Sequence, residues 1–197
     1  MTAVPRRLAA VACVALGLSA CTRSATPRFY TLSATATPDG LPATALAVLV
    51  GPVSLPASVD RPQLVVQRGP NQVELQEFDR WAAPLDDGIA RAVAGNLSVL
   101  LGTPRVAATP LPGFEPAYRV RIAVERFDAA PGDGVTVEAL WVVEPAAARK
   151  PISGRTSAHE PMQGADLDAV AAAQSRALAV VSADVAAAIR ASARAAR

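Results

Sequence analysis

The stretch Tyr118-Arg119-Val120-Arg121-Ile122-Ala123-Val124-Glu125 decides the fold, because large apolar side chains occupy every second position along it. A period of two is typical of a β-strand with one buried and one solvated face. The turn residues Pro131-Gly132-Asp133-Gly134 follow, and residues 135–144 repeat the alternation. The second half of 135–144 is apolar on both faces, so we expect its far side to meet a helix or a partner. Residues 152–158 predict a weak edge strand after this antiparallel pair.

A strand–helix–strand unit precedes this pair. The near-continuous apolar run 45–53 predicts a buried central strand. Apolar residues then recur at helical spacing from about Pro84 to Leu101, and Gly102 predicts the end of that helix. Residues 105–108 close the unit as a second strand.

Shorter elements surround the unit. Residues 28–32 have the aromatic and β-branched content of a strand, and residues 33–44 contain the Pro and Gly residues of a loop. Two short apolar segments, 64–67 and 72–75, flank a Gly-containing turn. That arrangement predicts a β-hairpin.

The last element is a long Ala-rich helix with one apolar stripe and Asp166 at its N-cap. Arg190, Arg194 and Arg197 lie near its end, where cations interact favourably with the helix dipole. The elements together predict a single α/β domain, in which a mixed β-sheet with a β-hairpin packs against two long helices. The pattern leaves open which face of the sheet the terminal helix covers.

The N-terminus resembles a bacterial lipoprotein signal. Arg6 and Arg7 precede the apolar run 8–20, which ends in Leu18-Ser19-Ala20 just before Cys21. The run is shorter than the roughly 20 residues that a membrane-spanning helix needs. In such signals the chain is cut before the cysteine, which is lipidated. The alternative is an ordinary secretory signal with Cys21 as a bystander.

The lipoprotein interpretation divides the chain into a signal peptide (1–20), a lipidated tether (21–27) and a domain (28–197). Cys21 would carry a diacylglycerol and an N-acyl chain such as palmitate. Cys13 leaves with the signal, so the mature chain has no intramolecular disulfide. The two arginines of the signal also leave, and basic and acidic residues are then equal in number. This balance argues against nucleic acid as a partner.

Catalytic and metal-binding patterns are weak. His159 is the only histidine, and Glu160, Ser153 and Ser157 near it lie in an apparent polar loop without a nucleophile-elbow pattern. A single histidine without a free thiol leaves only carboxylates as metal ligands. The sequence therefore predicts no enzyme, no metal and no cofactor beyond the lipid on Cys21.

Four segments of the mature chain form a recognisable pattern: Phe29-Tyr30-Thr31-Leu32, Val50-Gly51-Pro52-Val53-Ser54-Leu55-Pro56, Asp60-Arg61-Pro62-Gln63-Leu64-Val65 and Phe78-Asp79-Arg80-Trp81-Ala82-Ala83-Pro84-Leu85. Together they resemble the ABC-type transport auxiliary lipoprotein family (PqiC-like lipoproteins associated with membrane integrity). The resemblance is most specific in the last two segments. It weakens after about residue 110.

The resemblance implies a non-catalytic auxiliary subunit of a lipid transport system between the Gram-negative membranes. Its partners would be a mammalian-cell-entry (MCE) domain protein and the associated ABC transporter or permease. It implies a lipid anchor in the periplasmic face of the outer membrane, and Thr22 lacks the aspartate of the enteric inner-membrane retention signal. Homo-oligomerisation is left open. The alternative function is that of an envelope-structural or assembly lipoprotein without a transport role.

Three motif residues are candidates for partner binding. Arg61 and Arg80-Trp81 flank the predicted hairpin, whose two ends meet if it folds back on itself. Arginine and tryptophan are enriched in binding hot spots. The structural alternatives are a core position for Trp81 and a capping or turn role for Arg61.

Overall fold

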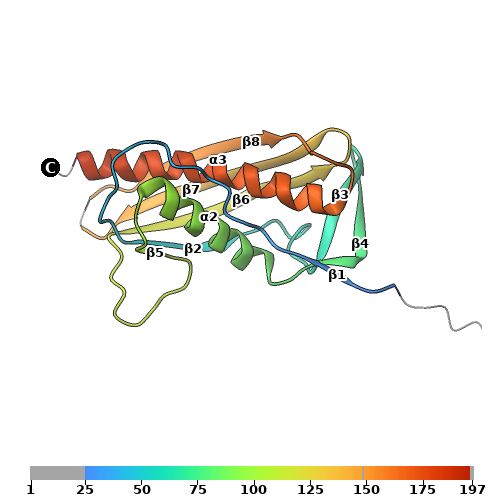
Figure 1. The fold of residues 1–197 in the computed structure, drawn as a ribbon, viewed down its shortest axis with the longest axis horizontal. Coiled ribbons are helices and arrows are strands. Elements are labelled where there is room, and N and C mark those ends of the chain that lie inside the picture. The colour runs from blue at the N-terminus through green and yellow to red at the C-terminus, as the bar shows by residue number, and fades with distance from the viewer. Residues whose placement is uncertain (1–24, 148, 196–197) are drawn as a thin grey trace, which may run out of the picture.

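The computed structural model describes residues 25–147 and 149–195 (Figure 1). Cys21, the signal peptide and Arg197 lie outside these residues. The strands and helices are β1 (Arg28–Tyr30), β2 (Val48–Ser54), β3 (Gln63–Gly69), β4 (Gln72–Trp81), α2 (Leu85–Leu101), β5 (Val106–Ala107), β6 (Tyr118–Ala130), β7 (Gly134–Pro145), β8 (Ile152–Glu160) and α3 (Leu167–Arg194). The predicted single α/β domain with a hairpin and two long helices on the sheet is confirmed. Its strands divide into a five-stranded and a three-stranded sheet.

The larger sheet has the order β5-β2-β6-β7-β8. β6, β7 and β8 form an antiparallel meander, and β2 runs parallel to both of its neighbours. The strand–helix–strand unit is confirmed as β2-α2-β5, although β5 is only two residues long. β8 pairs with β7 continuously from Ile152 to Glu160, so the edge strand predicted as weak is a full member of the sheet.

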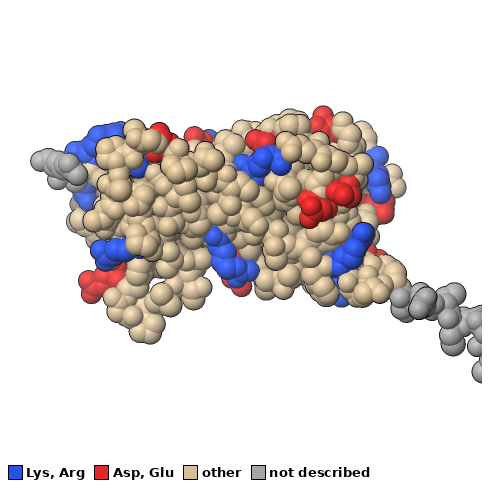
Figure 2. Space-filling view, viewed as in Figure 1, with Lys and Arg blue, Asp and Glu red and all other residues tan. Residues whose placement is uncertain are grey.

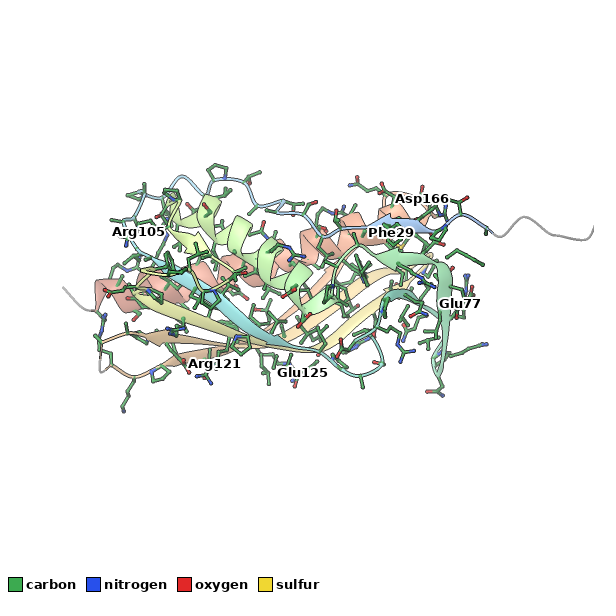
Figure 3. All side chains as sticks on the ribbon, turned by 90° about the horizontal axis from the view of Figure 1, so that it is seen from below. Phe29, Glu77, Arg105, Arg121, Glu125 and Asp166 are labelled. Carbon is green, nitrogen blue, oxygen red and sulfur yellow. The ribbon has the colours of Figure 1, made fainter. Side chains whose placement is uncertain are left out.

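Both helices cover the same face of the larger sheet, which answers the question that the sequence left open. α2 packs on β2, α3 packs on β7 and β8, and the helices contact each other. The buried side of β6 carries Val120, Ile122 and Val124. In Figure 3 the labelled Arg121 and Glu125 point to the opposite side of the sheet, away from the helices.

The outer face of the larger sheet carries a ladder of ion pairs. Arg155 contacts Glu138 at 2.6 Å and Glu125 at 3.0 Å, and Arg126 also contacts Glu138 at 2.9 Å. The side chain of Leu140 stands among them and is 42% exposed. Both long helices occupy the other face, so of the two coverings predicted for this side of β7 the helix is wrong for the described residues, and the partner stays a prediction.

The predicted loop after β1 crosses the helical layer as a strap (residues 31–46; Figure 1). The backbone N–H groups of Thr35 and Ala36 donate to Oδ1 of Asn96 at 2.8 and 2.9 Å. The N–H of Ser33 donates to Oγ of Ser175 at 3.1 Å. Since Asn96 lies on α2 and Ser175 on α3, the strap joins the two helices.

Arg190 has a different role from the predicted one. Its side chain is largely buried and bonds to segments outside its own helix. Its guanidinium donates to the carbonyl of Pro42 on the strap at 2.9 Å and to that of Leu100 at 2.7 Å. Arg190 therefore satisfies a carbonyl in the last turn of α2, where a cation is favoured.

Helix α3 is long and apolar enough to cross a membrane by composition alone. Its predicted stripe faces the sheet, and most of its apolar stretch is buried. We therefore assign α3 to the core of the domain. The buried core helix of a domain can be as long and as apolar as a helix that spans a membrane.

Candidate functional site

Three of the four family-like segments meet in the three-stranded sheet, at the end of the molecule opposite the C-terminus (Figure 1), whereas the segment from Val50 to Pro56 belongs to β2 of the larger sheet. Its strand order is β1-β4-β3, with β1 parallel to β4 and β3 antiparallel to β4. Gln63 is in register with Arg80, and the N–H of Trp81 donates to the carbonyl of Pro62 at 2.8 Å. The hairpin thus folds back as predicted, and its two ends lie side by side.

Trp81 is part of the core. Its side chain is 8% exposed and packs against Phe127 with ring centroids 6.5 Å apart and a 60° tilt between the rings. Successive residues of a strand project from opposite faces, so Arg80 points away from Trp81. The three predicted binding residues are neighbours but do not form one exposed patch. Their role in binding stays a prediction.

A hollow of about 380 Å³ opens beside the buried ring of Trp81, and we name it the motif hollow. Its lining comes from the two most specific family-like segments: Asp60, Arg61, Pro62, Trp81, Ala83, Pro84 and Leu85. A second hollow of about 250 Å³, beneath the start of the strap, shares Trp81, Ala83 and Leu85 with it. The segment from Trp81 to Leu85 therefore stands as a ridge between two hollows.

Arg61 lines the motif hollow with a guanidinium that is only partly satisfied. Nη2 donates to the carbonyl of Ala57 at 3.2 Å, and Nε is buried without a hydrogen-bond partner. Within the part of the chain that the structure describes, no carboxylate lies within ion-pair distance of Arg61. Its positive charge is therefore available to an anionic group that enters the hollow.

Asp79 connects two family-like segments. Its carboxylate accepts from Arg28 Nε at 2.6 Å, from Arg28 Nη2 at 3.1 Å and from the hydroxyl of Tyr30 at 2.9 Å. The hydrogen bonds from Arg28, followed by that from Tyr30, hold the pKa of Asp79 below its ordinary value although burial opposes them. Burial, and after it the hydrogen bond to Asp79, raises the pKa of Tyr30 above its ordinary value. This cluster attaches β1 to the hairpin.

We expect Asp79→Asn to lower the free energy of unfolding by about 1–2 kcal/mol at neutral pH, because a charge-assisted contact with a mostly exposed Arg28 is lost. The folded-state pKa of Asp79 lies below the ordinary value of 3.8. Its stabilising contribution is therefore complete above that value and is lost as the pH falls through the folded pKa. Urea unfolding of both proteins at several pH values should show a difference that shrinks below about pH 4. A difference independent of pH would contradict this role.

His159 does not lie in a loop, so that prediction is wrong. It is an exposed residue of β8, in register with Thr136 of β7, and its Nδ1 lies 3.2 Å from Thr136 Oγ1. Ser153 and Ser157 lie on the same exposed side of β8. On this surface His159, Ser153 and Ser157 lie in a row along one strand, and they do not point toward a common centre where a substrate could bind.

Acidic and basic side chains are interspersed on the face drawn in Figure 2, and neither sign gathers into a broad patch. Among residues 25–147 and 149–195, no three His, Cys, Asp or Glu side chains cluster as metal ligands would.

The chain belongs to the family described as the ABC-type transport auxiliary lipoprotein component, which it matches over residues 30–186. A solved structure titled as an uncharacterized protein is similar in fold, with 21% identity, a TM-score of 0.67, and coverage of 84% of this chain and 99% of that one. A DUF330 protein from Xanthomonas campestris gives 22% identity, a TM-score of 0.65, and coverage of 80% and 92%. A comparison with curated proteins gives no match.

Proposed function

We propose that this protein is a non-catalytic, lipid-anchored auxiliary subunit of an MCE-type intermembrane lipid transport system. Membership of the transport auxiliary family supports the auxiliary role. The observation that carries the mode of action is the motif hollow, because its lining comes from the two segments most specific to the family. An apolar hollow with Arg61 at its rim supports contact with a side chain of another protein.

The partner would be an MCE-domain protein or the associated ABC transporter or permease. A side chain entering the motif hollow would pack on the edge of Trp81, and an acidic group would pair with Arg61. Arg80 projects from the other face of β4, away from the hollow, and its charge reversal tests whether it also contributes to capture. A well-packed aromatic floor beside a charged rim is the composition of binding hot spots.

The anchor would be the acylated Cys21 in the periplasmic face of the outer membrane. Thr22 after the cysteine supports outer-membrane sorting under the enteric rule. Three acyl chains support permanent attachment, because one chain alone gives only marginal binding. The domain would then bind its partner while it stays attached to the outer membrane.

Charge reversal tests the partner surface. We expect Arg61→Glu combined with Arg80→Glu to weaken partner capture by about 30-fold, since a lost hot spot costs about 2 kcal/mol or more. The melting temperature should hardly change, because neither arginine forms an ion pair in the described part of the chain. The measurement is capture of the partner by the tethered protein, together with a thermal melt.

The matched control is Arg105→Glu combined with Arg119→Glu, two exposed arginines outside the motif hollow. It should leave capture unchanged. His159→Ala should leave the envelope phenotype of the cells intact, and loss of that phenotype with a normally folded His159→Ala protein would favour an enzyme. Unchanged capture by the Arg61 and Arg80 variant, or its unfolding, would place the partner surface elsewhere.

A further inference from the structure

The three-stranded sheet exposes two aromatic rings on one face. Phe29 of β1 is 65% exposed, and Phe78 of β4 is 47% exposed. Phe29 is in register with Arg80, and Phe78 lies two residues before Arg80 on the same strand. Residues in register, and residues two apart on a strand, project from the same face. Phe29 therefore lies directly beside Arg80 on the neighbouring strand, and Phe78 lies close to Arg80 along β4; we name these three exposed or partly exposed residues the interfacial face.

Arg80 has only weak neighbours on this face. Its Nε donates to the carbonyl of Glu77 at 3.1 Å, and no carboxylate of the described residues lies within ion-pair distance. Exposed rings beside an arginine form an amphipathic surface. In membrane proteins, aromatic rings lie at headgroup level, and a long basic side chain reaches the phosphates while its stem contacts the apolar layer.

The position of this face relative to the tether identifies its occupant. β1 begins at Arg28, seven residues after Cys21. An extended chain covers at most about 3.6 Å per residue, so this leash reaches about 25 Å. Phe29 lies at the same end of the domain as the start of the described chain, whereas Arg105 lies toward the other end (Figure 3). A short leash holds this end of the domain near the bilayer.

We propose that the interfacial face docks on the phospholipid leaflet that holds the acyl chains of Cys21. This inference rests on the lipid anchor of the proposed function. Phe29 and Phe78 insert at headgroup level, and Arg80 contacts lipid phosphate. Trp81 projects from the opposite face of β4, so docking leaves the motif hollow open to a protein partner. The contact would give the tethered domain a defined orientation on the membrane.

The test uses the full-length, lipidated protein in vesicles of phosphatidylethanolamine and phosphatidylglycerol that contain brominated phosphatidylcholine. Phe29→Trp and Phe78→Trp each introduce a fluorophore at the interfacial face. Leu140→Trp, at an exposed site on the outer face of the larger sheet, is the matched control. The native Trp81 and Trp141 are both buried and supply a background that the wild-type protein measures.

We expect bromine to quench most of the added emission of Phe29→Trp and Phe78→Trp, with a blue shift on reconstitution, and to leave Leu140→Trp unquenched. Absence of quenching at both positions, in protein whose Cys21 acylation is verified by mass spectrometry, would overturn the inference and leave the anchor intact. A blue shift that appears without vesicles and grows with protein concentration would show that the interfacial face binds a second copy of the protein, and this result would also overturn the inference. Absence of acyl chains on Cys21 would overturn both the anchor and the docking.

Discussion

Cys21→Ser is expected to abolish acylation completely. Serine lacks the thiol that receives the diacylglycerol, and the lipoprotein signal peptidase acts on the acylated precursor. The variant therefore loses its lipid anchor and remains an unprocessed precursor; of the acyl chains, even one alone would bind with only about 10⁴ M⁻¹. Fatty-acid labelling and the size of the product measure the effect: the variant should be unlabelled and should keep residues 1–20.

Cys13→Ser is the matched control for this prediction, because it removes the other cysteine of the chain from within the signal. We expect it to be labelled, processed and membrane-bound like the wild type. Normal labelling of Cys21→Ser would contradict the lipoprotein interpretation. Loss of labelling in both variants would point to a damaged signal and not to a specific acceptor.

Gly154→Val is expected to produce the largest loss of stability. Gly154 of β8 lies directly opposite Trp141 of β7, and a Cβ at this position would overlap the indole ring. Trp141 Nε1 donates to Thr156 Oγ1 at 3.0 Å, and that hydroxyl donates to Asp184 of α3 at 2.6 Å. A displaced indole therefore breaks a hydrogen-bonded chain that joins β7, β8 and α3.

We expect Gly154→Val to lower the free energy of unfolding by about 3 kcal/mol, from overpacking and the lost hydrogen bonds. For a domain of this size the melting temperature should fall by about 6–12 °C. Gly69→Val is the matched control, because a Cβ at Gly69 would meet nothing within 4 Å. Thermal and urea unfolding compare the two variants. An equal loss of stability in both would show that overlap with Trp141 does not cause the effect at Gly154.

The helices were predictable because their signals are local. Gly102 ends α2 in the left-handed conformation with φ 60°, and Asp166 accepts from the N–H of Ala169 at 2.9 Å to begin α3. The alternation along β6 and β7 is local as well, and it identified their buried sides. These features depend on a few neighbouring residues, so the pattern of the sequence contains them.

The errors concern contacts between distant segments. β8 lacks an apolar alternation, and its full pairing depends on Trp141 covering Gly154 from the next strand. His159 was assigned to a loop for the same reason. Arg190 was predicted to serve its own helix, but its partners are the carbonyls of Pro42 and Leu100 in distant segments. No local pattern reveals such partners.

The candidate site was predictable only in part. The fold-back of the hairpin follows from its turn, and this brought Arg61 and Trp81 together as expected. The burial of Trp81 depends on Phe127, a residue of the other sheet. The role of Asp79 was missed, although Arg28 and Tyr30 alternate on β1 as Asp79 and Trp81 do on β4. The pairing of β1 with β4, which lie far apart in the sequence, can be recognised only in the tertiary structure.

The most direct test of the central claim is the identity of the proteins that bind the lipidated domain. The tagged, full-length protein would be crosslinked in the envelopes of its own cells, purified, and its partners quantified by mass spectrometry. We predict enrichment of an MCE-domain protein and its ABC transporter or permease, and loss of both with the Arg61→Glu and Arg80→Glu variant. Enrichment of cell-wall or envelope-assembly proteins alone would contradict the account and favour a structural lipoprotein.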